Sequence, residues 1–398
     1  MKKLMSFISM IFLMLPVLFS CERTAESETV KIGLLHSFTG SMAVSECPLK
    51  NAELLAVREI NGAGGVLGRK IEIVEEDGES DAKVFAAKAR KLIEEDSVAA
   101  IFGCWTSASR KAVKPVVEDF YSLLWYPVQY EGMEASPNIM YMGAAPNQQI
   151  VPAISFCAEQ FGKRMFLVGS DYIFPRTANR IIKAELADIK GESCGEEYVP
   201  LDASDFTKIV EKIKAASPDV IINTINGISN KSFFEELKRQ GITAEKIPVM
   251  SFSIAEEEVS TIGAKNLAGQ YVSWNYFYTM QNEENRRFIR ALSAAFGRGM
   301  VTSDPMEAAY IAIHMWAKAC EKAGSFETEK VRIAVKNMEF EAPEGEVILD
   351  GYNQHLYKKV RIGKIRDTGI IEEVWVSPEQ VKPDPYLSSY AWARGLYK

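Results

Sequence analysis

The segment GCWTSASRKAV, residues 103–113, places a thiol, an indole and three hydroxyl groups within a few residues of one another. A catalytic thiol needs a neighbouring base that lowers its pKa. The chain has three histidines, His36, His314 and His355, and no motif places any of them beside Cys104, although His36 ends a predicted strand. We therefore predict that Cys104 is a small apolar wall residue and that the chain has no catalytic residue.

Polar and aromatic side chains follow the predicted strands at the points where those strands end. The carboxyl ends of parallel strands meet at one edge of a sheet, and ligands bind there. The segments at these ends are HSFTGS, GCWTSAS, WYPVQYEG, GSDYIFP and NTINGIS, and the nearest charges are Asp171 and Glu131. Hydroxyls, amides and aromatic rings suit a small, neutral ligand that forms many hydrogen bonds. The predicted substrate-binding residues are Ser37, Trp105, Thr106, Ser107, Tyr126, Gln129, Tyr172, Phe174, Asn226 and Trp274.

Several of these residues have a structural alternative. Ser107 stands where a helix begins, so N-capping and ligand contact are equally open for it. One of Trp105 and Trp125 is expected to pack between lobes. Core or interface packing is the alternative for Tyr126 and Tyr172.

The elements that position these residues alternate along the chain. TVKIGLLH, KIEIVEED, VAAIFG and SLLWYP are strand-like, and segments with helical periodicity separate them. The pattern restarts with RMFLVGSDY, EEYVPL, DVIINTING and IPVMSF. Apolar strands separated by helices predict parallel sheets covered on both faces. We predict an α/β fold with two doubly wound, Rossmann-like lobes and a cleft between them, and antiparallel strands in the tail from Gly345.

Composition and motifs exclude several classes of partner. The formal net charge of the 398 residues is −7, and basic residues are interleaved with acidic ones, which argues against nucleic acid. The glycine run NGAGGVLG follows a predicted helix and precedes a strand, the reverse of a dinucleotide fingerprint. The acidic run EEDGESD does not match an EF-hand loop. We predict no cofactor and assign no metal-binding residue, and whether a metal binds stays open.

The first residues resemble a secretory leader. MKK gives a positive start, an apolar run follows, and LFSC ends it, which resembles a bacterial lipobox. We predict a signal peptide over residues 1–20, lipid attachment at Cys21, a lipidated tether over 21–27 and anchoring on a membrane surface. Ordinary cleavage nearby, with Cys21 unmodified, is the alternative. The other cysteines, at 47, 104, 157, 194 and 320, form no CxxC motif, and their pairing stays open.

Long motifs across the mature chain resemble the urea-binding lipoproteins of urea ABC importers and, more loosely, the amide-sensor proteins of aliphatic amidase operons. The motifs are LLHSFTGSMAVSE, EINGAGGVLGRKIE, GCWTSASRKAVKPV, LLWYPVQYEGMEASPNIMYMGAAPNQQ, GSDYIFPRTAN, NTINGISN, SDPMEAAYIA and APEGEVILDGYNQH. The resemblance implies a type I periplasmic-binding-protein fold, a Venus flytrap whose lobes are joined by a hinge of three crossings. It also implies that residues 28–145 and 277–344 form the first lobe, and that residues 146–276 and 345–398 form the second.

The resemblance assigns roles to four positions. In the amide sensor the ligand amide is held at positions that correspond to Trp105, Ser107, Tyr126 and Tyr172. Trp105 stands where the sensor has tyrosine, and Val128 and Gln129 stand where it has threonine and proline, as in the urea-binding members. Gln129 and Asn226 offer amide oxygens to the additional N–H donors of urea, which would discriminate urea from acetamide.

The leading hypothesis is a membrane-anchored receptor outside the cytoplasm that captures urea and delivers it to the permease subunits of an ABC importer. A receptor for short-chain amides or branched-chain amino acids is the alternative, although amino acids need paired charges that the predicted cleft lacks. A regulatory sensor and a hydrolase acting on urea or amides are weaker hypotheses. The predicted leader argues against the sensor, and the lack of a dense catalytic site argues against the hydrolase.

Overall fold

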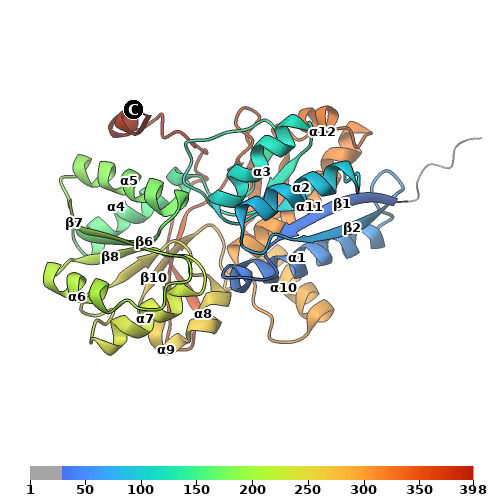
Figure 1. Ribbon diagram of the computed structural model, residues 1–398. Coiled ribbons are helices and arrows are strands. Elements are labelled where there is room, and N and C mark those ends of the chain that lie inside the picture. Colours follow the sequence, from blue (N-terminus) through green and yellow to red (C-terminus); the bar gives the residue numbers. More distant parts are fainter. Residues whose placement is uncertain (1–28, 398) are drawn as a thin grey trace, which may run out of the picture.

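The computed structural model describes residues 29–397. The predicted signal peptide, Cys21 and the tether lie outside the described residues. Two α/β lobes lie side by side, one coloured mainly blue and orange and the other green and yellow (Figure 1). Within residues 29–397, no helix is long and apolar enough to cross a membrane.

The first lobe is built on a five-stranded parallel sheet with the order β2-β1-β3-β4-β5. Apolar side chains from its strands and flanking helices form one core, in which Phe102 stacks on Trp125 and meets Trp316 edge to face. The strands are β1 (Thr29–His36), β2 (Lys70–Asp77), β3 (Ile101–Gly103), β4 (Leu124–Tyr126) and β5 (Ile139–Tyr141). The helices are α1 (Ala43–Gly62), α2 (Ala82–Glu94), α3 (Ser107–Asp119), α10 (Glu283–Phe296), α11 (Asp304–Ala323) and α12 (Thr328–Ala334).

The second lobe is built on a seven-stranded sheet with the order β15-β14-β10-β9-β8-β6-β7. Five strands are parallel, and β14 and β15 join as antiparallel strands. The strands are β6 (Arg164–Ser170), β7 (Glu192–Val199), β8 (Val220–Thr224), β9 (Val249–Ser251), β10 (Tyr271–Trp274), β14 (Arg361–Ile365) and β15 (Ile371–Val376). The helical elements are η1 (Pro146–Gln148), α4 (Ile150–Gln160), α5 (Ile173–Asp188), α6 (Thr207–Ala216), α7 (Ser229–Arg239), α8 (Glu256–Ile262), α9 (Ala264–Leu267) and η2 (Ala391–Tyr397).

Helices cover both faces of the second sheet. One core contains Val210, Phe233 and Val259 from α6, α7 and α8, and the other contains Ile154 and Ile182 from α4 and α5. This is the covered parallel sheet that the unbroken apolar strands predict. The predicted fold class, two doubly wound lobes, is confirmed.

The lobe boundaries differ from the predicted ones at one point. A small antiparallel sheet, formed by β11 (Glu339–Ala342), β12 (Gly345–Leu349) and β13 (Leu356–Tyr357), contributes Val347 and Leu356 to the first lobe's core. Residues 345–357 therefore pack with the first lobe, and the chain crosses to the second lobe between β13 and β14. The other two crossings follow β5 and β10.

Candidate functional site

The turn between β3 and α3 is pressed against β1. Gly103 has φ 139°, and a Cβ there would lie 2.0 Å from the carbonyl oxygen of Leu35. The N–H of Cys104, which has φ 63°, donates to the same carbonyl at 2.9 Å. This close approach fixes where helix α3 begins, and so fixes the side chains of its first turn.

The N-cap of α3 is Thr106. Its Oγ1 accepts from the N–H of Ser109 at 3.0 Å and donates to the Ser109 hydroxyl at 3.1 Å. Capping therefore occupies Thr106, which the sequence predicted as a ligand contact, and leaves the hydroxyl of Ser107 for another role.

Ser107 lies in a buried network of charged side chains. Its hydroxyl donates to Glu131, and it accepts from Nη1 of Arg110 at 3.1 Å. Arg110 is fully buried and bonds Glu131 at 3.0 Å through Nη2 and Glu134 at 2.9 Å through Nε. Burial alone would raise the pKa of Glu134, but Arg110 and Lys111 lower it to about 2. The positive charge of Arg110 is thus paired with two carboxylates, those of Glu131 and Glu134.

Aromatic rings enclose this network. The guanidinium of Arg110 lies 5.1 Å from the ring centre of Tyr126 and 4.5 Å from that of Tyr130. The hydroxyl of Tyr126 donates to the carbonyl oxygen of Trp105 at 2.5 Å. Three of the predicted binding residues, Trp105, Ser107 and Tyr126, are therefore brought together.

Tyr172 approaches the same place from the second lobe. Burial, and then the nearby Tyr126 and Glu131, raise the pKa of Tyr172 well above its ordinary value, so its hydroxyl stays protonated. Helices α3 and α5 pack against each other here. Asn226 is tied to the same loop, because its N–H donates to Ser170 at 3.1 Å and Tyr172 donates its own N–H to the Ser170 carbonyl at 3.0 Å.

Gln129 joins the two lobes. Its Nε2 donates to the carbonyl oxygen of Phe252 at 2.8 Å, while its Oε1 is buried and has no hydrogen-bond partner within the described part of the chain. A buried amide oxygen without a partner is costly unless a ligand or water supplies a donor. Gln129 therefore presents an acceptor.

Ser37 lies on the α1 side of the site. Its N–H donates to Glu46 at 2.6 Å, and its hydroxyl accepts from the N–H of Ser80 at 3.1 Å. Burial raises the pKa of Glu46 to about 7. The negative charge of Glu46 contributes to raising the pKa values of both Cys104 and Tyr172, so this loop lies beside the site.

The structure places two predicted residues elsewhere. Trp274 lies in the second lobe's core with Val272 and Phe277, and its indole N–H donates to the carbonyl oxygen of Ile254 at 2.8 Å. Phe174 packs in the core on the other face of that sheet. Trp274 is the last residue of β10 and Phe174 lies in the first turn of α5, and both side chains pack into the lobe's cores beneath the covering helices.

Sequence reasoning missed Arg110 and Glu134, and it treated Glu131 only as a nearby charge. The available signal was charge pairing: Arg110 lies in the first turns of α3, and both glutamates follow β4 in the segment YEGME. Elements that start at the same sheet edge bring such residues together even when they are far apart in the chain.

The family model of the periplasmic binding protein domain matches residues 30–391. The chain belongs to this family. Its fold is that of a type I periplasmic binding protein, and the family consists of solute-binding receptors that act outside the cytoplasm.

Relatives of this periplasmic binding protein carry names of amino-acid receptors. The chain is 22% identical over 375 residues to Leu/Ile/Val-binding protein homolog 6 of Brucella melitensis, covering 92% of this chain and 95% of the relative. It is 25% identical over 337 residues to the leucine-, isoleucine-, valine-, threonine- and alanine-binding protein of Pseudomonas aeruginosa, covering 81% of this chain and 86% of that relative.

Two solved structures show the same fold. A solute-binding protein from Rhodopseudomonas palustris in complex with 4-hydroxybenzoate has a TM-score of 0.80 at 23% identity, covering 89% of this chain and 98% of that one. A branched-chain amino acid substrate-binding protein from Streptococcus pneumoniae in complex with isoleucine has a TM-score of 0.76 at 21% identity, covering 89% of this chain and 100% of that one.

Cys104 of this periplasmic binding protein is not placed for nucleophilic chemistry. Burial raises the pKa of its thiol, and His36 bonds Glu53 at 2.9 Å instead. The cysteines at 47, 104, 157, 194 and 320 are unbridged. Among the described residues, no group of three or more His, Cys, Asp or Glu side chains could hold a metal ion.

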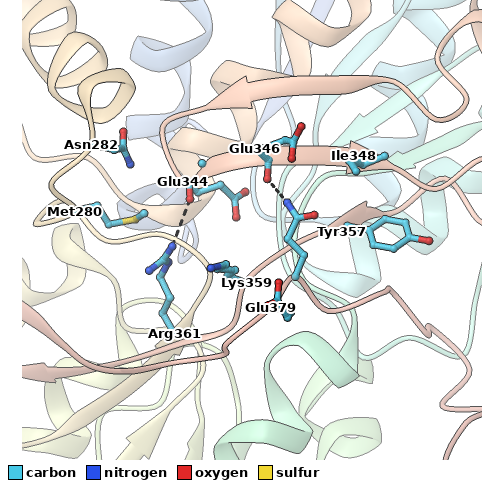
Figure 2. A pocket seen from close by; sticks show the side chains of 11 residues that line it. Met280, Asn282, Glu344, Glu346, Ile348, Tyr357, Lys359, Arg361 and Glu379 are labelled. Carbon is cyan, nitrogen blue, oxygen red and sulfur yellow. Dashed lines mark hydrogen bonds between the residues drawn. The ribbon is translucent and has the colours of Figure 1, made fainter.

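A cavity of about 710 Å³ lies where the chain crosses from β13 to β14, away from the predicted binding residues. Figure 2 shows Glu344, Lys359 and Arg361 around it. The arginine donates to the carbonyl oxygen of Glu344 at 3.4 Å and pairs with Glu373, while Glu344 itself pairs with Lys358. These internal pairs engage Glu344 and Arg361, two of the five charged residues that line the cavity.

Proposed function

We propose that this chain is the receptor of an ABC importer for a small, uncharged solute rich in N–H groups, with urea as the best candidate. The observation that carries this proposal is the polarity of the site. The hydroxyl protons of Ser107 and Tyr126 and an amide proton of Gln129 are all donated within the protein. These three side chains therefore offer oxygen lone pairs to a ligand.

Urea is complementary to such a site. It has four N–H donors and one carbonyl acceptor, whereas acetamide replaces one amino group by a methyl. The first N–H groups of a helix have no partner within the helix, so the start of α3 supplies donors for the urea carbonyl. A buried acceptor left without a donor costs about 1 to 3 kcal/mol, which favours urea over acetamide.

A branched-chain amino acid is the second candidate. The names of the relatives match it better than they match urea. Against it stands the charge of the site, because the N–H groups at the start of α3 could serve either ligand, but the buried cation Arg110 is already shared by Glu131 and Glu134 and is not free to pair with an α-carboxylate.

Closure of the lobes is part of the proposed mechanism. Four heavy atoms at a ceiling near −1.5 kcal/mol each give about −6 kcal/mol, a dissociation constant of tens of micromolar. Contacts from both lobes are needed to approach that ceiling, and Tyr172 and Asn226 would supply those of the second lobe. The closed form would then be delivered to the importer's permease subunits.

Membrane attachment through a lipid on Cys21 is part of the proposal and rests on the LFSC segment. Incorporation of labelled palmitate that disappears in Cys21→Ser supports it. Incorporation that persists in that variant contradicts it.

Calorimetric titration with urea, acetamide, formamide and leucine tests the ligand. We expect urea to bind in the micromolar range, and Tyr126→Phe, which keeps the ring and removes the acceptor, to weaken binding about tenfold. Heat with leucine and none with urea would keep the fold and overturn the urea proposal. Ammonia released from urea by the purified chain would overturn a purely binding role.

A further inference from the structure

Ser107, Glu131 and Arg110 form a closed ring of hydrogen bonds. The serine hydroxyl donates to Oε2 of Glu131 and accepts from Nη1 of Arg110 at 3.1 Å, and Nη2 of Arg110 donates to Oε1 of Glu131 at 3.0 Å. Their exposed fractions are 2%, 1% and 0%. Because a guanidinium only donates and a carboxylate only accepts, the direction of every bond in the ring is fixed.

The fixed direction determines what Ser107 can offer to a ligand. A hydroxyl has one proton and two lone pairs. Glu131 takes the proton and Arg110 takes one lone pair, so one lone pair is left. A ligand atom that faces Ser107 must therefore be a hydrogen-bond donor.

We propose that Glu131 is a positioning residue that sets the polarity of Ser107 and thereby selects ligands that bring an N–H group to it. The proposal rests on the proposed site, but it holds whether the donor belongs to an amide or to an ammonium group. It also predicts that a carboxylate is disfavoured there, since Ser107 has no proton left to donate and Glu131 repels a second carboxylate.

Glu134 provides a matched control. It bonds the same guanidinium, at 2.9 Å through Nε, and it is also buried, at 7% exposed. Its other side-chain partners are Lys111 at 2.7 Å and Tyr141 at 3.3 Å, and it does not bond Ser107. Glu131→Gln and Glu134→Gln therefore remove the same charge from the same arginine, but only the first changes the partner of Ser107.

The experiment measures dissociation constants of the full chain and both variants for urea and for acetate, which has the shape of acetamide but only acceptors. In Glu131→Gln the new amide can donate to Ser107, which frees the hydroxyl proton to face the ligand. We expect the preference for urea over acetate to fall at least tenfold in Glu131→Gln. We expect it to stay within about threefold of wild type in Glu134→Gln, although both variants melt at lower temperature.

The outcomes separate this inference from the urea proposal. An unchanged preference in Glu131→Gln, or an equal change in Glu134→Gln, overturns the role of Glu131. If the wild type binds leucine and ignores urea, only the urea proposal fails, and a tenfold greater loss of leucine affinity in Glu131→Gln than in Glu134→Gln supports the inference. If Glu131→Gln does not fold, Ser107→Ala must lose urea affinity without gaining acetate. A wild type that binds none of these ligands overturns both.

Discussion

The hydroxyl of Ser45 on α1 donates a 2.6 Å hydrogen bond to Oε1 of Glu258 on α8, which ties a helix of the first lobe to a helix of the second. A second glutamate of α8, Glu257, accepts at 2.7 Å from the hydroxyl of Ser303, the N-cap of first-lobe helix α11, while Glu256 accepts at 2.8 Å from the N–H of Tyr278, in the segment that follows β10. The first turn of α8, with Glu256, Glu257 and Glu258, is called the latch here because Glu257 and Glu258 bond residues of the first lobe.

Removal of one latch donor should weaken ligand binding without changing the site itself. A buried hydrogen bond contributes about 0.5 to 1.5 kcal/mol, so Ser45→Ala should raise the ligand's dissociation constant about twofold to twelvefold. Titration calorimetry measures this, and Ser260→Ala, at an exposed serine of the same helix, is the control. Equal affinities of both variants would show that the latch has no part in closure.

Ligand affinity should fall as pH rises. Burial, followed by the charge of Glu258, raises the pKa of Glu257 from its ordinary value of 4.5 to about 8, and burial also raises the pKa values of Glu256 and Glu258. The charges that act on these groups within the described chain are their neighbours in α8 and Asp304 of α11, all acidic. Among these charges within the described chain, no cation offsets the mutual repulsion of the glutamates in their ionised form.

The sign of this effect follows from the protonated latch. Separation of the lobes admits water and returns the carboxyl groups toward 4.5, so the closed form binds protons more tightly. The contribution to closure is complete below about pH 4.5 and is lost as the pH passes through about 8. Dissociation constants between pH 5.5 and 8.5 should rise by up to about tenfold per pH unit for each proton released. Glu257→Gln should flatten this profile, whereas Glu235→Gln on the exposed face of α7 should leave it unchanged.

Cys104 should be inert in the folded protein. Burial raises the pKa of its thiol, and Cys47 is exposed on α1. Alkylation with iodoacetamide at pH 8, followed by mass spectrometry of the peptides, should label Cys47 at least about tenfold faster than Cys104, because the thiolate is the reacting species. Faster labelling of Cys104 would revive a nucleophilic role for it.

The sequence predicts the layers of this protein better than it predicts the site. Unbroken apolar strands separated by periodic helices are enough to identify two parallel sheets, because that pattern arises only when both faces are covered. The three-residue strand β5 (Ile139–Tyr141) escapes this reasoning, since it is too short to show a pattern. Residues 345–357 escape it as well, because antiparallel hairpins carry no signal of which lobe they pack on.

Residues of the candidate site could be grouped from the sequence only where backbone position decides their place. Trp105, Ser107 and Tyr126 follow strand ends, and the structure brings them together. Trp274 is the last residue of β10, yet its side chain packs into the core. Arg110 and Glu131 were missed as a pair, because their contact depends on how α3 and the segment after β4 pack, which no local pattern encodes.

Gly227 should be needed for closure of the lobes. It follows β8 with φ 67°, and a Cβ there would lie 2.8 Å from the carbonyl oxygen of Ser41 and 3.1 Å from Sδ of Met42, both in the first lobe. Alanine at this position would hold the lobes apart. Gly241 offers the matched comparison, because its φ is 78° but an added Cβ would meet nothing within 4 Å.

Both substitutions impose the same left-handed backbone strain, about 1 kcal/mol, and should lower the melting temperature by similar amounts. Only Gly227→Ala should lose ligand affinity, by about tenfold or more, because closure supplies the second lobe's contacts. Thermal melts and titration calorimetry on the two variants separate backbone strain from the contact with Ser41. If Gly241→Ala loses as much affinity as Gly227→Ala, strain alone explains the effect, and the contact with Ser41 does not limit closure.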